Sequence, residues 1–196
     1  MRTPLLLSIL LATALLACDG DPTGPLAGPH LQFGYDGDRE GSFSTLGDLE
    51  LDEGGAATGA GVAAVRLGGE AEGWTVHARR LPAPNRTDQV RLELEGVTGP
   101  GTHELGLAGC QPGDERPCRT LVVMLEESDG AAGVVTRTYV AISGSVTVDA
   151  VGMDAVSGRF EAETVLSTDD RRRLAVRSGT FEAPIADLPV PQEQAP

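Results

Sequence analysis

The segment Val90-Arg-Leu-Glu-Leu-Glu95 places apolar side chains at every second position, with charged side chains between them. This alternation is typical of an antiparallel β-strand with one buried face and one face in solvent. Residues 74–79 repeat the pattern, and Leu105 and Leu107 mark another strand over residues 102–108. The apolar run 121–125 predicts a strand covered on both faces. Strands therefore dominate the predicted structure.

No segment of the chain favours a helix. The best candidate, residues 56–66, contains Gly59 and Gly61, and each glycine in a helix costs about 1 kcal/mol relative to alanine. The acidic, glycine-rich residues 47–61 are more typical of a mobile loop.

The phase of the alternation predicts one long strand and one bulge. Val140, Ile142, Val146 and Val148 all occupy even-numbered positions, on both sides of Gly144. This constant parity predicts a single long strand over residues 140–148. Near the C-terminus the apolar positions change from even (Leu174, Val176) to odd (Phe181). Such a slip needs one extra residue, and Ser178-Gly179 is where a β-bulge fits.

A short motif recurs in the chain as Ser157-Gly-Arg-Phe160 and Ser178-Gly-Thr-Phe181, with related forms at 41–43 and 143–146. The spacing is irregular, which excludes a solenoid and suits a meander in which glycine permits a kink and the next apolar residue enters the core. About nine or ten strands result. We predict an all-β antiparallel sandwich, with a closed β-barrel as the alternative.

The N-terminus carries a targeting signal. Arg2 precedes the apolar stretch Leu5–Ala17, which is shorter than the roughly 20 residues that span a bilayer and fits the h-region of a signal peptide. It ends in Leu15-Leu-Ala-Cys18, which resembles the lipobox of bacterial lipoproteins. The resemblance implies cleavage after Ala17 and acylation of Cys18. The alternative is an ordinary secretory signal with Cys18 as a bystander.

These features divide the chain into four parts. We expect a signal peptide at 1–17, the lipidated Cys18 with a Pro/Gly-rich tether at 18–30, a β-domain at 31–186 and a Pro-rich tail at 187–196. The expected location is the bacterial cell envelope, with the protein held at a membrane by its N-terminal lipid. Asp19 bears on the choice between inner and outer membrane, and that choice stays open.

The charge restricts the possible partners. The formal net charge is −14, and all 15 basic residues are arginine. This balance argues against nucleic acid and against electrostatic binding to an anionic membrane surface. A neutral or basic partner fits better.

Two cysteines remain besides Cys18. Cys110 and Cys118 flank turn-forming residues, so we predict that they form a structural disulfide that closes a hairpin loop. A free thiol pair and a metal site are the alternatives. Zinc is disfavoured because a zinc site takes four ligands and no second Cys or His pair has a useful spacing.

Asp36, Asp38 and Glu40 place three carboxylates at alternate positions, as calcium loops can. A tight turn explains the same residues, and we favour it because the later glutamate of an EF-hand loop is missing. The run Arg171–Arg173 is interpreted as part of a charged hairpin tip over 168–174, neutralised locally, rather than as a binding patch.

The histidines are scattered and predict no joint site. His30 falls in the predicted tether, His77 on the polar face of its strand, and His103 at the start of another strand with the parity of Leu105.

The block Phe33–Ile185 resembles, through its short glycine-based motifs, secreted β-rich bacterial lipoproteins of unknown function. This resemblance supplies no catalytic residues, and the chain has no Gly-x-Ser-x-Gly elbow and no phosphate-binding glycine motif. We therefore expect a non-enzymatic, cofactor-free module with a binding or structural role, whose partner is a protein, a glycan or another envelope component. Two alternatives stay open. One is an envelope glycan hydrolase with carboxylates from distant strands, and the other is a β-barrel carrier of an apolar ligand.

Overall fold

The computed structural model describes residues 27–52, 56–68, 72–111, 113–128 and 133–186. The described residues form strands and no helix, and within these ranges no helix is therefore long and apolar enough to cross a membrane. The strands are β1 (His30–Gly37), β2 (Gly41–Leu46), β3 (Glu50–Leu51), β4 (Ala57–Thr58), β5 (Gly61–Leu67), β6 (Gly73–Ala83), β7 (Arg86–Glu95), β8 (Gly101–Leu105), β9 (Arg119–Ser128), β10 (Val134–Val151), β11 (Ala155–Leu166) and β12 (Asp169–Pro184).

Ten of these strands form one antiparallel sheet in the order β2-β1-β12-β11-β10-β9-β7-β6-β5, with β8 paired to β10. The short strands β3 and β4 pair only with each other. Most neighbours in the sheet are also neighbours in sequence, as in a meander. The prediction of an antiparallel all-β fold with nine or ten strands is confirmed.

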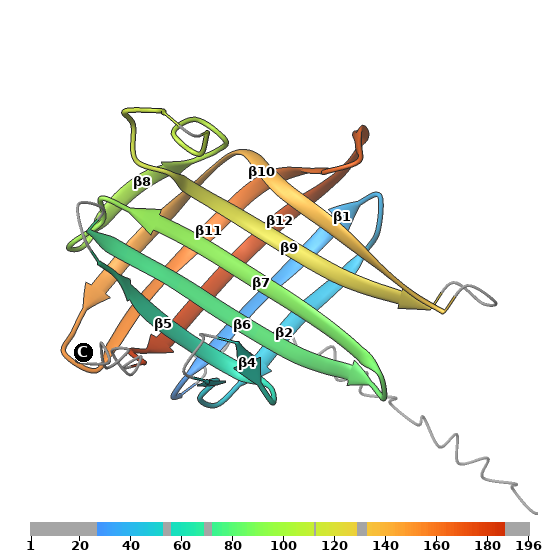
Figure 1. Ribbon diagram of the computed structural model, residues 1–196, viewed down its shortest axis with the longest axis horizontal. Helices are drawn as coiled ribbons and strands as arrows, with labels where there is room; N and C mark the ends of the chain where they lie inside the picture. Colours follow the sequence, from blue (N-terminus) through green and yellow to red (C-terminus); the bar gives the residue numbers. More distant parts are fainter. Residues whose placement is uncertain (1–26, 53–55, 69–71, 112, 129–132, 187–196) are drawn as a thin grey trace, which may run out of the picture.

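The sheet folds over into two layers. In Figure 1, β5, β6, β7 and β9 cross in front of β1, β12 and β11. The long strand β10 joins the layers, because Val134–Val140 pair with β9 of one layer and Tyr139–Val151 pair with β11 of the other. This arrangement is the predicted sandwich.

The change of layer occurs at a bulge in β10. The pairing with β11 shifts between Ala141 and Ser143, so the inward positions change from Tyr139 and Ala141 to Val146. The prediction that Ile142 shares one phase with the later valines is therefore wrong. Ile142 points outward with 38% of its surface exposed. The prediction of one long strand is correct.

The edge strands β2 and β5 do not form a ladder with each other, so the sheet is not a closed barrel. Two isolated parallel bridges close the seam, Asp48 with Val62 and Ala64 with Ile185. The amide of Ala186 also donates to the carbonyl of Ala64, at 2.8 Å. Both bridges involve β5 and cover part of its free edge, which protects it from pairing with another chain.

The space between the layers is filled by apolar side chains. Phe33 stacks on Phe43 with ring centroids 5.3 Å apart and meets the edge of Phe160 at 5.8 Å. Phe160 in turn lies 6.2 Å from Phe181. All four rings are buried, so the few aromatic residues of this chain concentrate in one part of the core.

The recurring Ser-Gly-x-Phe motif explains the packing of β11 on β12. Gly158 is the cross-strand partner of Phe181, and Phe160 is the partner of Gly179. Each ring lies over the glycine of the other motif, where a Cβ would collide with it. The predicted bulge at Ser178-Gly179 is confirmed by a register shift and by φ = 51° at Ser178.

Three local predictions need correction. His30 is not in a tether, because it is the first residue of β1 and only 8% exposed. The strand predicted over residues 102–108 ends at Leu105, so that Leu107 is 42% exposed. Part of the acidic segment 47–61 forms the paired strands β3 and β4. The predicted signal peptide at 1–17, Cys18, Asp19 and the predicted tail at 187–196 lie outside the described residues.

Candidate functional site

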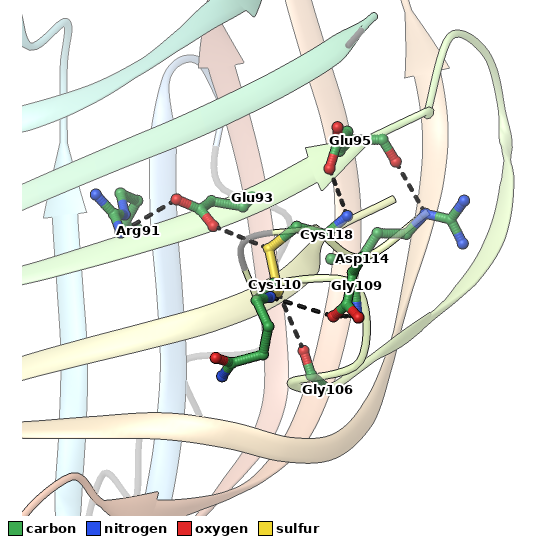
Figure 2. The surroundings of a disulfide bond; sticks show 10 residues. Arg91, Glu93, Glu95, Gly106, Gly109, Cys110, Asp114 and Cys118 are labelled. Carbon is green, nitrogen blue, oxygen red and sulfur yellow. Dashed lines mark hydrogen bonds and ion pairs between the residues drawn. A yellow bond between two sulfur atoms is a disulfide. The ribbon is translucent and has the colours of Figure 1, made fainter. Parts of the chain in front are cut away.

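The disulfide predicted between Cys110 and Cys118 is present (Figure 2). It closes the loop between β8 and β9, which also has polar support of its own. The Asp114 carboxylate accepts hydrogen bonds from the amides of Gly109 and Gln111, at 3.1 and 3.2 Å. On the other side of the loop, the Cys118 amide donates to the Glu95 carboxylate at 2.5 Å. The loop is therefore held by several contacts besides the disulfide.

A third acidic side chain lies against the sulfurs. Glu93 of β7 places Oε2 3.3 Å from Cys118 Sγ, while its Oε1 is 3.1 Å from an Nη of Arg91. A disulfide sulfur carries no proton, so the first of these is a contact and not a hydrogen bond. Figure 2 shows the Glu93 carboxylate between Arg91 and the disulfide.

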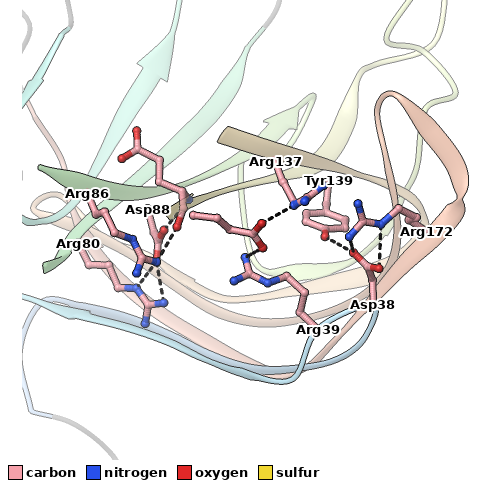
Figure 3. Close-up of polar contacts among 10 residues, drawn as sticks. Asp38, Arg39, Arg80, Arg86, Asp88, Arg137, Tyr139 and Arg172 are labelled. Atoms are coloured by element: carbon pink, nitrogen blue, oxygen red, sulfur yellow. Dashed lines mark hydrogen bonds and ion pairs between the residues drawn. The ribbon is translucent and has the colours of Figure 1, made fainter. Parts of the chain in front are cut away.

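A cluster of charged side chains occupies the other end of the sandwich (Figure 3). We call it the charged end; it comprises Asp38, Arg39, Arg80, Arg86, Asp88, Glu126, Glu127, Arg137, Tyr139 and Arg172. These residues come from both layers and lie far apart in sequence. Their contacts tie the layers together where the hydrophobic core ends.

Asp38 is the centre of one half of the charged end. The Arg172 guanidinium donates to both carboxylate oxygens, at 2.8 and 2.6 Å, and the buried Tyr139 hydroxyl donates to Oδ2 at 2.7 Å. The bond from Arg172 lowers the pKa of Asp38. Burial, together with the Asp38 charge, raises the pKa of Tyr139 to about 12. Both groups are therefore held in the protonation state that suits this hydrogen bond.

Asp88 is the centre of the other half and is 2% exposed. Its Oδ2 accepts from Nε and Nη2 of Arg80, at 2.8 and 2.7 Å, and its Oδ1 accepts from the Glu126 amide at 2.9 Å. Arg80 also donates to the carbonyl of Ser42 on β2, at 2.6 Å, and its guanidinium lies 4.9 Å from the centre of the Phe43 ring. A buried charge with this many partners has a structural role.

Glu127 lies between two arginines, Arg39 at 2.9 Å and Arg137 at 2.6 Å. Glu127 belongs to β9 and Arg39 to the turn between β1 and β2, so this pair also spans the layers. The carboxylates of Asp38, Asp88 and Glu127 are thus all neutralised by arginine.

The residues of the calcium candidate do not converge. Asp38 is engaged by Arg172, and Asp36 lies 4.0 Å from Arg177. Together with Glu40 they belong to the hairpin of β1 and β2, where Tyr35 pairs with Gly41 across a tight connection. The alternative interpretation, a tight turn, describes this segment. The run Arg171–Arg173 lies in β12, after the turn at residues 167–168, rather than at the hairpin tip predicted over 168–174. Arg172 pairs with the distant Asp38 rather than with its neighbours.

A groove of about 790 Å³ lies on the outer face of the layer that contains β1, β12, β11 and β10. We call it the outer groove. Most of the side chains that line it are polar and come from neighbouring strands; they are His30, Gln32, Ser145, Thr147, Asp149, Ser157, Arg159, Glu161, Ser178, Thr180 and Glu182. Bulges in β12 near Ser178 and in β10 near Asp149 border this stretch, and bulges bend the strands that carry them.

The ladder fixes the spacing of these side chains. One row runs straight across six strands, because each member is the cross-strand partner of the next: Thr102, Thr147, Arg159, Thr180, Gln32 and Ser44. Within the part of the chain that is described, Thr180 Oγ1 is buried and has no hydrogen-bond partner. Arg159 is paired with Asp149 at 2.8 Å, which leaves Glu161 and Glu182 as the remaining charges of the lining.

The three histidines lie in different places. His30 borders the outer groove and its Nδ1 is 2.8 Å from the Gly28 carbonyl. His77 on β6 is half-buried, and burial and the charge of Arg91 lower its pKa. His103 on β8 has its pKa lowered by burial and by Arg119. The three residues thus lie on three different strands, β1, β6 and β8.

The chain matches no protein-family model, no curated protein and no solved structure. The case for a function therefore depends on the geometry of the described residues and on the N-terminal sequence.

Proposed function

We propose that this chain is a lipid-anchored module of the bacterial cell envelope that binds a neutral or basic partner through the outer groove and catalyses no reaction. The lipobox-like sequence ending at Cys18 supports the anchor. The Pro/Gly-rich stretch after it provides length between the membrane and the sandwich. The groove supports the binding role.

The observation that carries the proposal is the polar lining of the outer groove. Its hydroxyl, amide and carboxylate groups project from four adjacent strands, whose backbones are fixed by the ladder. A ligand group that hydrogen-bonds Thr180 Oγ1 would give this buried atom a partner, which favours binding because unpaired buried polar atoms are costly. Because the ladder already fixes the backbone of these strands, little backbone ordering opposes binding.

The charge of the groove indicates the kind of partner. Asp149, Glu161 and Glu182 outnumber the single Arg159, and the whole chain carries −14. An anionic partner would be repelled, whereas a cationic segment or a neutral glycan would not. We assign the groove to a cationic segment, because two of its carboxylates have no arginine partner among the contacts described above.

The carboxylates of the charged end give the glycan hydrolase alternative less support than the outer groove gives the binding role. A hydrolase needs one carboxyl that stays protonated as an acid and a second carboxylate beside it. The pKa of Asp38 is lowered, and Asp88 and Glu127 are occupied by arginine. The apolar carrier needs an enclosed cavity, whereas buried apolar side chains, the four phenylalanine rings among them, pack between the layers of the described residues.

Calorimetric titration with a short arginine-rich peptide and with an uncharged oligosaccharide tests the proposal. We expect the peptide to bind the native chain, and the double variant Glu161→Gln/Glu182→Gln to bind it at least tenfold more weakly, roughly 1.4 kcal/mol. The matched control Glu50→Gln removes an exposed carboxylate on β3 and should leave binding unchanged. Equal binding by the groove variant and the control would exclude the groove, and no binding of either probe would exclude a neutral or basic partner.

A further inference from the structure

We propose that the reduced form of this protein binds one thiophilic divalent cation, such as Zn²⁺ or Cd²⁺, through Cys110, Cys118 and Glu93. Ligand atoms of these three residues lie within 4.8 Å of one another, and all three side chains are half-buried. The site is independent of the outer groove and of the proposed partner.

The third ligand comes from a distant part of the chain. Two cysteines alone are a weak zinc site, because zinc prefers four ligands. Glu93 Oε2 lies 3.3 Å from Cys118 Sγ, which places a carboxylate where a metal bound to that sulfur would need one. Two thiolates and a carboxylate then leave the fourth tetrahedral position to water.

The chemistry requires reduction of the disulfide. A phosphine supplies two electrons and water supplies two protons, so the S–S bond breaks, two thiols form, and the phosphine takes the water oxygen and leaves as its oxide. The cation then replaces both thiol protons and forms two metal–sulfur bonds, releasing two protons to solvent. Glu93 adds a carboxylate to the two thiolates, so the three ligands and the divalent cation together carry one negative charge.

The backbone positions do not depend on the disulfide. Cys118 is held by two bonds to Glu95, since its amide donates to the carboxylate at 2.5 Å and its carbonyl accepts from the Glu95 amide at 3.1 Å. Cys110 donates its amide to the Leu107 carbonyl at 3.2 Å, and Asp114 holds the residues on either side of Cys110. After reduction the two thiols therefore stay close together.

The geometry can accommodate a metal with small changes. The two Cα atoms are 4.5 Å apart. Tetrahedral coordination at about 2.3 Å per sulfur separates two sulfurs by roughly 3.8 Å, which rotation about the two Cα–Cβ bonds can supply. The Glu93 carboxylate must turn toward the metal, and its contact with Arg91 at 3.1 Å is exposed enough to give way.

The test is a Cd²⁺ titration of the full chain after reduction with a phosphine, which is removed before the metal is added under anaerobic conditions. Ultraviolet thiolate-to-cadmium charge transfer reports binding, and calorimetry gives the stoichiometry. We expect one Cd²⁺ per reduced chain and no charge-transfer band in the oxidised chain. Absence of the band in the reduced chain would overturn the proposal.

Variants decide whether Glu93 is a ligand. We expect Glu93→Gln to weaken binding by about tenfold or more and Cys118→Ser to abolish the band. Glu115→Gln, which removes an exposed carboxylate from the same loop, should bind as the native chain does. Arg91→Ala frees Glu93 from its ion pair and should bind at least as tightly. Native affinity in Glu93→Gln, or weaker binding in Arg91→Ala, would contradict the assignment.

Discussion

Phe160 on β11 lies directly opposite Gly179 on β12, and its ring fills the space that a Cβ at position 179 would enter, with Cε2 only 2.6 Å from that point. The same relation holds in reverse between Phe181 and Gly158, where the corresponding distance is 2.9 Å. Two copies of one short motif thus complete each other across the strand pair. This reciprocal packing of rings on glycines explains why the motif recurs in neighbouring strands.

Gly179→Ala should therefore destabilise the protein. The added methyl group collides with the buried ring of Phe160, and overpacking of this kind costs about 1–3 kcal/mol. Gly34→Ala is the matched control, because nothing lies within 4 Å of its Cβ position; there the change should be close to neutral. Urea unfolding measures both. Equal stability of the two variants would show that the ring does not occupy this space.

Asp88→Ala should be among the most damaging single changes in the charged end. It leaves the Arg80 guanidinium without its carboxylate, and loss of one partner of a buried pair costs about 3–5 kcal/mol. Asp149→Ala breaks the exposed pair with Arg159 and should cost no more than about 1 kcal/mol. Thermal unfolding compares the two variants. A loss at Asp88 as small as that at Asp149 would mean that the pair is not buried in solution.

Tyr139 should ionise only at high pH. Tyr139 has a pKa raised to about 12, so its neutral form is favoured by folding. The contribution of this pKa shift to the free energy of unfolding is complete below about pH 10 and is lost as the pH rises toward 12. Absorbance of tyrosinate, followed together with circular dichroism, should show a late transition that Tyr139→Phe removes.

Asp38→Asn should move that late transition to lower pH, because the hydrogen bond and the charge of Asp38 both raise the pKa of Tyr139. A midpoint near 10 for Tyr139 in the folded native chain would contradict the buried contact.

The sequence predicted the features that repeat along a single strand. Alternation at 90–95 gave the strand type, and the change of parity between Val176 and Phe181 located the bulge at Ser178-Gly179. The bulge in β10 was missed, because the exposed Ile142 is apolar and the parity therefore looked continuous. Local pattern shows a slip only where the outward side chain is polar.

The charged end could not be predicted in the same way. Asp38 meets Tyr139 and Arg172 across sequence separations of 101 and 134 residues, and nothing in the local pattern of either segment signals the contact. Glu93 was likewise hidden, since it occupies an ordinary outward position in the alternation at 90–95. Only the pairing of β7 with β9 brings it to the disulfide.

The central claim is that this sandwich is held at a membrane by a lipid on Cys18. Metabolic labelling with a radioactive fatty acid, in a bacterium that processes lipoproteins, tests it most directly. We expect label on the native chain and on the double variant Cys110→Ser/Cys118→Ser, and none on Cys18→Ala. Equal label on Cys18→Ala and the native chain, or no label on the native chain, would contradict the claim.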